Sequence, residues 1–394
     1  MTGILIVLPR LPHDRSGTGQ RSRLLVEAAC KVGPTHVVTL DGSRVTRPLD
    51  EVLPGVSSLT SLDSDIMMPK RLFAKAFGGG ARLISPALGY RVEPALQTSL
   101  QQLAAHHGVS TVIFRYARLF CAGGLTRSHG LRVLVDVDDR DDQKYHTALV
   151  SIFGARLAGG WIAQRAIGRL SNLLRHRLSD ASLIWFAAQE DLWSFDEAET
   201  AILPNVPYWS ALDVPAPPSS APPVTLFVGV YGHQPNREGM AWMLREVWPT
   251  VVKQRPDARL RIVGKGNWMD MREAHSSLPG VEYIGEVDNV SPEYEAARLC
   301  ICPVREGGGS KIKVIEAAAF GRPVVASPHA LRGFAWPEGL QFLQAADPND
   351  FALECLRLLD DPDLADRTGT ALREWQTQAY SREAFVSRVV SALA

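Results

Sequence analysis

Short, continuously apolar runs that alternate with longer helical patterns restrict the fold of this chain more than any other feature. An unbroken run rich in Val, Ile and Leu is typical of a strand covered on both faces, as in parallel sheets between layers of helices. The runs form one series in each half of the chain: residues 4–8, 36–40, 111–115, 133–137 and 182–186, then 225–230, 259–263, 281–284, 299–303, 323–326 and 341–343.

Two series of such strands predict two doubly wound, Rossmann-like α/β domains. The length of 394 residues agrees, since it exceeds the usual size of one domain. Between the series, residues 207–223 are rich in proline, which suits neither helix nor central strand and predicts a linker. We therefore expect domains over residues 1–206 and 224–380. Ser381 then precedes apolar residues at helical spacing, which predicts a capped final helix over residues 381–394.

Charge and composition exclude several classes of protein. The 42 basic and 42 acidic side chains cancel, whereas a nucleic-acid-binding protein needs a net basic surface. No uncharged apolar stretch reaches the length of about 18 residues that a membrane-spanning helix requires. The first residues are too quickly charged for a signal peptide, and the five scattered cysteines are expected to be reduced, buried thiols. These features predict a cytoplasmic protein.

Two stretches in the first half, residues 66–92 and 143–178, combine basic with apolar side chains and contain no acidic residue. This composition is typical of amphipathic helices that lie on anionic lipid, and it predicts a protein peripheral on a membrane surface. The alternative is that these helices pack on the core and expose an ordinary basic face to solvent.

The segment most suggestive of chemistry is CPVREGGGSKIKVIEAAAFGRPVVAS, residues 302–327. A strand is expected to end at Pro303, three glycines follow, and Ser310 is placed to cap a helix over residues 311–320. Glycines let a backbone approach a ligand closely, and a helix N-terminus attracts a diphosphate. The residues of this loop that we expect to bind phosphate are Gly307, Gly308, Gly309, Ser310, Lys311 and Lys313.

Glu316 completes this candidate site. It lies about 60° around the helix from Lys313, so its carboxylate can bind ribose hydroxyls while the cations hold phosphates. The alternative interpretation is a glycine-rich turn followed by surface lysines.

The segment resembles the nucleotide-sugar site of retaining glycosyltransferases with the GT-B fold, in the broad family 4 that includes many bacterial polysaccharide enzymes. Its pattern, G-x-G-[ST]-x-x-K-x-x-E-A-x-A-x-G-x-P-V-V-A, is matched from Gly307 to Ala326. The family's "FVG…PN" start resembles residues 227–229 with 235–236, which adds Gly229 and Asn236 to the expected donor site. The resemblance implies two domains that face each other across a cleft, with the last helix crossing back to the first domain. It implies no metal and no other cofactor.

One position departs from the family pattern. Many members carry a first glutamate eight residues before the second, where it contacts the transferred sugar, and here that position is Gly308. Glu306, ten residues before Glu316, is the candidate replacement.

Candidate residues also occur in the first half. The loop containing Gly17 and Gly19 has dinucleotide-like glycine spacing, but it starts too far from the preceding strand for a dehydrogenase. The resemblance implies that it faces the donor; the alternative is a solvent loop. Asp138 and Asp139 follow a strand, where they are candidates to bind acceptor hydroxyls or act as base. The alternative is a helix start stabilised by acidic side chains.

The resemblance implies an enzyme that transfers a sugar from a nucleoside-diphosphate sugar to a saccharide or lipid-linked acceptor in surface-polysaccharide assembly, with retained configuration. Its partners would be that nucleotide sugar, the acceptor and the inner-leaflet membrane surface, with no nucleic acid. Two alternatives remain open: a nucleotide-sugar 2-epimerase, and a catalytically inactive protein that binds nucleotide sugars.

Overall fold

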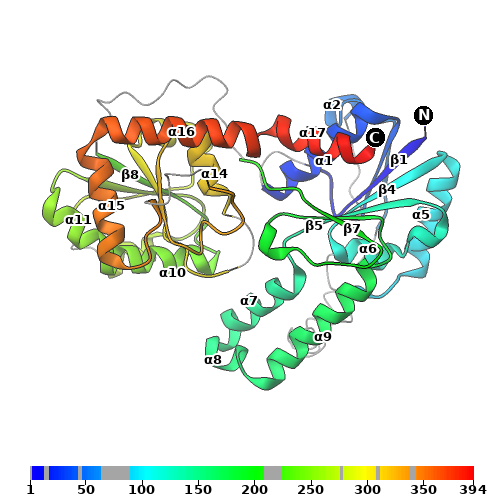
Figure 1. The fold of residues 1–394 in the computed structure, drawn as a ribbon, viewed down its shortest axis with the longest axis horizontal. Helices are drawn as coiled ribbons and strands as arrows, with labels where there is room; N and C mark the ends of the chain where they lie inside the picture. Colours follow the sequence, from blue (N-terminus) through cyan, green and yellow to red (C-terminus); the bar gives the residue numbers. More distant parts are fainter. Residues whose placement is uncertain are drawn as a thin grey trace. The chain divides into compact units, whose positions relative to one another are not determined.

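The chain forms two compact units, each built on its own sheet (Figure 1). The computed structural model describes residues 2–12, 17–42, 47–63, 89–207, 223–275, 278–307, 311–336 and 343–394. Unit 1 comprises Met1–Asn205 with Phe385–Ala394, and unit 2 comprises Val206–Ala384. Nearly all of the expected proline-rich linker lies outside the described residues.

Unit 1 contains a sheet of seven parallel strands in the order β3-β2-β1-β4-β5-β6-β7. Every residue of β1, β2 and β6 is buried, as the continuous apolar runs predicted. The edge strands β3 and β7 are only partly buried and were not predicted, because their sequences SLTS and ETAI contain no apolar run. The bounds are β1 Gly3–Leu8, β2 Thr35–Thr39, β3 Ser58–Ser61, β4 Val109–Arg115, β5 Arg132–Asp138, β6 Leu183–Phe186 and β7 Glu199–Ile202.

The helices of unit 1 pack on this sheet, except that α7, α8 and α9 together project away from it (Figure 1). Only the second half of α9 buries a leucine row, Leu170, Leu174 and Leu178, whose spacing of four places it on one helix face. The bounds are α1 Gly17–Val32, α2 Leu49–Val52, α5 Pro94–His106, α6 Ala117–Gly123, η2 Arg127–His129, α7 Asp141–Phe153, α8 Ala155–Ala158, α9 Trp161–Leu178 and η3 Gln189–Asp191.

Unit 2 contains a sheet of five parallel strands in the order β10-β9-β8-β11-β12. Its predicted strands are confirmed to within two residues, apart from 341–343: residues 341–342 lie outside the described part, and Gln344 forms only an isolated bridge with Ala326. The strands are β8 Val224–Val228, β9 Arg259–Val263, β10 Val281–Gly285, β11 Leu299–Cys302 and β12 Val324–Ala326. The helices are α10 Gln234–Trp242, the π-helix η4 Met243–Val247, α11 Trp248–Gln254, α12 Met269–Ala274, α13 Ser291–Ala296, α14 Ile312–Ala319, α15 Pro348–Asp360 and α16 Pro362–Tyr380.

The final helix, α17 (Arg382–Leu393), begins where the sequence predicted. The Ser381 hydroxyl accepts a hydrogen bond from the backbone N–H of Ala384 at 3.1 Å, which is the expected N-terminal cap. Phe385 is buried in unit 1 under the guanidinium of Arg21, 5.3 Å from the ring centroid. The last ten residues therefore complete the fold of unit 1.

Strand order determines where sites can form. In each sheet the first strand lies between two strands reached in opposite directions: β1 between β2 and β4, and β8 between β9 and β11. Ligands of open α/β sheets bind at the carboxyl ends of strands at such a reversal. In the part of the chain that the structure describes, no helix has both the length and the apolarity needed to cross a bilayer.

Candidate functional site

The glycine-rich segment of unit 2 connects the carboxyl end of β11 to α14. Gly307 has a φ of 99°, a conformation that L side chains rarely adopt, and a Cβ there would lie 2.8 Å from Pro235 Cγ. The helix begins at Ile312, and its capping position is Lys311 with no side-chain cap. The expected start at residue 311 under a Ser310 cap was therefore off by one residue. Gly308, Gly309 and Ser310 themselves lie outside the described residues.

Lys313 points from α14 toward the end of β8. Its ammonium donates a hydrogen bond to Asn236 Oδ1 at 2.7 Å and lies 4.2 Å from the ring centroid of Phe227. Burial, together with the nearby charge of Lys311, lowers the pKa of Lys313 to about 8. Among the residues that the structure describes, no ion pair joins Lys313 to a carboxylate. A partly buried cation whose contacts among the described residues are an amide and a ring is well suited to attract an anion.

A second group of donors surrounds the carbonyl of Gly307. The Lys311 ammonium donates to it at 3.3 Å, and His329 Nε2 donates to it at 2.7 Å. Burial lowers the pKa of His329 and of His233, and Lys311 lowers both further. Both imidazoles are therefore neutral near pH 7, and the local positive charge comes from the two lysines.

Glycines bring the other segments close to this loop. A Cβ on Gly239 of α10 would lie 2.6 Å from the Pro303 carbonyl oxygen, and one on Gly229 would lie 2.9 Å from Asn236 Nδ2. Gly264 has a φ of 137°, and its Cβ would overlap the Gly229 carbonyl, 2.0 Å away. Backbone therefore packs on backbone at the carboxyl edge of the sheet, and Gly229 and Asn236 lie together as expected.

Glu316 is buried on α14 and accepts a hydrogen bond from the Tyr294 hydroxyl at 3.1 Å. The Tyr294 ring stacks on Phe320 with centroids 4.7 Å apart, which fixes the position of that hydroxyl. Burial and the charge of Glu316 raise the pKa of Tyr294 well above its usual value, so the phenol remains a donor. The carboxylate is thus held in one orientation at the edge of the sheet.

Glu306 lies beside a different face of α10, at a pocket of about 450 Å³ lined in part by Trp242 and Arg245. A hydrogen bond with Glu238, together with partial burial, raises the pKa of Glu306. One proton shared between the two carboxyl groups explains this, because two adjacent negative charges repel. The structure places Glu306 next to Gly307 in the loop, but pairs its side chain with Glu238.

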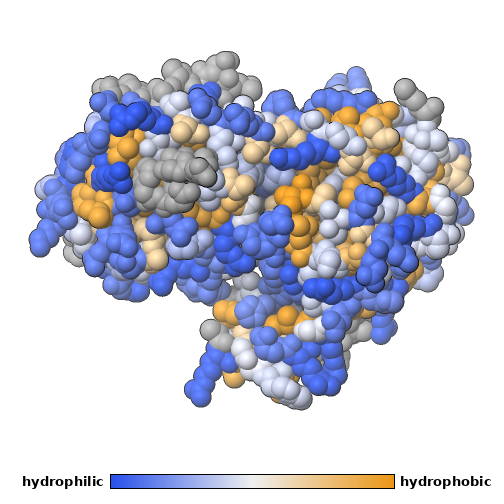
Figure 2. Space-filling view, viewed as in Figure 1, coloured by the Kyte–Doolittle hydropathy of each residue, from blue (hydrophilic) through white to orange (hydrophobic). Residues whose placement is uncertain are grey.

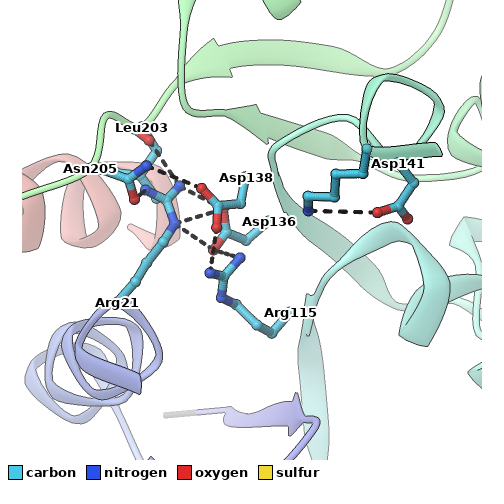
Figure 3. A network of polar contacts seen from close by, with 8 residues as sticks. Arg21, Arg115, Asp136, Asp138, Asp141, Leu203 and Asn205 are labelled. Atoms are coloured by element: carbon cyan, nitrogen blue, oxygen red, sulfur yellow. Dashed lines mark hydrogen bonds and ion pairs between the residues drawn. The ribbon is translucent and has the colours of Figure 1, made fainter. Parts of the chain in front are cut away.

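Unit 1 contains a buried charge network at the carboxyl ends of β4 and β5 (Figure 3). Arg21 of α1 contacts both carboxylate oxygens of Asp136, with its shortest contact at 2.6 Å, and donates to the Leu203 carbonyl at 2.8 Å. Arg115 donates to Asp138 at 2.7 Å and lies 3.2 Å from Asp136. Two arginines and two aspartates, all buried, therefore tie α1, β4 and β5 together.

Asp138 is held in a strained conformation by this network. Its φ is 61°, which is uncommon for a residue other than glycine, and Asn205 Nδ2 donates to its carboxylate at 3.2 Å. Burial alone would raise the pKa of Asp138, but the charges of Arg115 and Arg21 outweigh burial and hold it well below its usual range. Asp138 is thus a fixed, ionised carboxylate that orients its neighbours.

The following residues begin α7. Asp141 and Asp142 occupy its first turn, as in the alternative interpretation, and Asp142 pairs with Arg140 at 2.7 Å. Asp139 is only partly buried and precedes that turn. Lys144 lies 3.6 Å from Asp141 (Figure 3), and its pKa is raised because the charges of Asp141, Asp138 and Asp139 outweigh burial. Asp139 and Asp141 are therefore the two carboxylates of this group that are only partly buried.

The expected loop at Gly17 and Gly19 is corrected by the structure. Both glycines lie in the first turn of α1, which begins at Gly17. The short, polar side chains that suggested a loop are compatible with a helix start, because the first N–H groups of a helix need no intrahelical partner. Residues 13–16, which precede them, lie outside the described part.

Sequence reasoning missed several residues of both sites. Arg115 and Asn205 were not singled out because each contacts carboxylates more than twenty positions away. His329 was missed for the same reason, since it reaches Gly307 from beyond β12. The one signal in the sequence for Arg115 was a charged side chain at the end of a continuous apolar run.

Replacing Arg21 tests the network. Arg21→Met leaves the buried Asp136 carboxylate with half of its cationic partners, so we expect a loss of about 3 kcal/mol in the free energy of unfolding of unit 1. Urea denaturation followed by circular dichroism measures it. Lys31→Met on the same helix removes an exposed pair with Glu27 and should cost under about 1 kcal/mol. Equal costs for the two variants would contradict a structural role for the network.

Comparisons with known proteins relate part of this chain to one family. Residues 222–361 match the family described as "Glycosyl transferases group 1". The phosphatidyl-myo-inositol mannosyltransferase of Mycolicibacterium smegmatis is 34% identical over 105 residues, which are 26% of this chain and 26% of that protein. This alignment therefore spans about a quarter of the relative's length.

Solved structures match over almost the whole chain. Sucrose-phosphate synthase from Thermosynechococcus elongatus has a TM-score of 0.68 at 16% identity, covering 100% of this chain and 98% of that one. Anabaena HepE, in complex with UDP, has a TM-score of 0.62 at 12% identity, covering 100% and 99%. The chain therefore has the GT-B fold, two parallel-sheet α/β domains, and its second unit carries the match to group 1 glycosyl transferases.

Proposed function

We propose that this protein is a glycosyltransferase that binds a nucleoside-diphosphate sugar on unit 2. The observation that carries the proposal is Lys313, a partly buried ammonium with a lowered pKa and no paired carboxylate among the described residues. It lies in the first turn of α14, whose N-terminus favours negative charge, and beside Lys311 and the backbone of Gly307. The family match over residues 222–361 supports the same activity.

Within this proposal the diphosphate binds to the backbone between residues 307 and 313, and the two lysines contribute full charges. Transfer breaks the bond between the anomeric carbon and the β-phosphate oxygen, and negative charge develops on the departing nucleoside diphosphate. Lys311, Lys313 and the start of α14 stabilise that charge. Glu316, held by Tyr294, accepts hydrogen bonds from the ribose hydroxyls. Glu306 contacts the sugar in place of the family's first glutamate.

The acceptor is proposed to bind unit 1 at the carboxyl ends of β4 and β5. Asp138 is fixed by Arg115 and Asn205, so it positions this edge, and the partly buried Asp139 contacts the acceptor hydroxyl. We propose a saccharide on a lipid carrier as the acceptor, retention of configuration, and a place on the cytoplasmic face of the membrane. The motif matched from Gly307 to Ala326 supports retention, and the name of the mycobacterial relative supports a lipid acceptor.

Removing either charged group of unit 2 should weaken donor binding. Lys313→Met and Glu316→Gln each delete a charge-assisted contact that contributes roughly 1.5–3 kcal/mol, so at least about a tenfold loss of UDP affinity is expected. Titration calorimetry measures it. Lys265→Met, which removes an exposed lysine paired with Glu286, serves as control and should bind UDP as the parent does. Unchanged affinity in folded Lys313→Met would disprove the site.

The lowered pKa of Lys313 predicts a pH dependence. Because its pKa is about 8, the ammonium loses its proton as the pH rises through that value, and attraction for a diphosphate is lost with it. Phosphate ionisation is complete by then, since its second pKa is about 6. UDP affinity should therefore fall above pH 8, and binding near that pH should be accompanied by proton uptake, seen as calorimetric heats that vary with buffer. Lys313→Arg stays charged and should abolish the uptake; persistent uptake in that variant would refute the assignment.

Asp139 provides the test on the acceptor side. Asp139→Asn should lower the transfer rate at least about a hundredfold, within the range for loss of one catalytic group, while UDP affinity stays within a factor of two. Transfer is measured by release of UDP in the presence of acceptor. Glu190→Gln, an exposed carboxylate of unit 1, is the control and should leave both quantities unchanged. Loss of UDP affinity together with transfer would point to a structural role for Asp139.

A further inference from the structure

Large apolar side chains are exposed together at the tip of the helices that project from unit 1. Phe153, Leu157, Trp161 and Ile162 have exposed fractions of 48%, 65%, 73% and 78%. They lie within ten residues that span the end of α7, all of α8 and the start of α9. The other large apolar side chains exposed in the described residues, such as Val230 and Leu353, are scattered over unit 2. Figure 2 shows apolar surface among polar surface on this projection.

This concentration is unfavourable in water. Each large apolar side chain left in solvent forgoes the favourable free energy of its burial. A gathered, exposed apolar surface usually marks a site of interaction. The chain turns sharply here, since Gly154 has a φ of 80° and separates α7 from α8. The tip is thus a defined part of the fold, at the far end of α7 and the start of α9, which project from the sheet (Figure 1).

The charges around the tip are all positive. Arg156, Arg165 and Arg169 are exposed, and no acidic residue occurs between residues 143 and 178. The Arg165 guanidinium lies 5.4 Å from the ring centroid of Trp161, so cation and indole share one surface. Two such tips would repel each other, which disfavours a second copy of this chain as the partner. An anionic surface with an apolar layer beneath complements both properties.

We propose that residues 153–169, which we call the helical tip, dock this protein on a bilayer containing anionic phospholipid. Phe153, Leu157, Trp161 and Ile162 enter the boundary between headgroups and acyl chains, and the arginines contact lipid phosphates. The purpose of the docking rests on the proposed function, since it would bring the acceptor edge of unit 1 to a lipid-linked saccharide. The binding itself is measured without any transfer.

This assignment is narrower than the basic stretches of the sequence suggested. Residues 66–88 of the first stretch lie outside the described part of the chain. At the far end of α9, the guanidinium of Arg175 lies 4.7 Å from the Trp193 ring centroid of the domain body. The Leu170, Leu174 and Leu178 row also packs inward there. The lipid contact therefore belongs to the end of α7, to α8 and to the first half of α9, and not to the last turn of α9.

Vesicle co-sedimentation of the full chain tests the proposal. The parent should sediment with vesicles containing phosphatidylglycerol at low salt, less with rising salt, and far less with phosphatidylcholine alone. Arg165→Glu with Arg169→Glu should lower binding at least about tenfold, because each basic residue near anionic lipid contributes about 1 kcal/mol. Trp161→Ser with Ile162→Ser should also lower it at least about tenfold, through lost apolar burial.

Matched control variants carry the same changes on unit 2. Lys253→Glu with Arg272→Glu, and Met269→Ser with Leu353→Ser, alter exposed residues and should sediment as the parent does. Absence of parent binding to anionic vesicles, or equal binding by tip and control variants, would overturn the proposal. So would a smaller sedimentation coefficient of the tip variants without vesicles, which would show that the tip joins two copies. UDP affinity of the tip variants should match the parent, which separates this test from that of the donor site.

Discussion

The contact between Lys313 and Asn236 is the interaction on which the site of unit 2 depends. It joins α14 to α10 across the carboxyl edge of the sheet, and it holds an ammonium in a buried place where charge is costly. Asn236 is oriented in turn by its own bond to the Val230 carbonyl at 3.0 Å. Glycines are needed at positions 229, 239 and 264, because the backbone there passes so close to its neighbours that a side chain would clash. The folded site therefore presents a cation, without a carboxylate partner among the described residues, that gains from an anion.

Unit 1 also buries charged side chains, but there each charge has an opposite charge beside it. Its buried charges are compensated within the protein, since Arg21 and Arg115 share Asp136 and Asp138. A network of this kind fixes geometry more than it adds stability, because desolvation offsets much of the attraction. Its consequence is a rigid carboxyl edge with a strained Asp138 and the partly exposed Asp139 beside it. Unit 2 thus leaves Lys313 without a carboxylate partner among the described residues. Unit 1 instead uses its paired charges to hold the carboxyl edge of its sheet in place.

Local patterns determined which parts could be predicted from the sequence. Strands buried on both faces carry continuous apolar runs, and the glycine–lysine–glutamate spacing around α14 predicts a phosphate site within a few residues. The edge strands β3 and β7 carry no such run. The predicted start of α14 was off by one residue, because the ends of helices vary by a residue or two. The pairing of Arg21 with Asp136 spans 115 positions. Only the folded sheet brings such residues together, so no local pattern announces them.

Hydrogen exchange of the full chain, with and without UDP, tests the central claim most directly. Amide exchange slows where a ligand restrains the backbone. If unit 2 holds the diphosphate, peptides covering residues 229–237 and 303–316 should exchange more slowly with UDP, and Lys313→Met should remove the effect. Protection confined to the carboxyl edge of unit 1, or none at saturating UDP, would contradict the assignment of the donor site to unit 2.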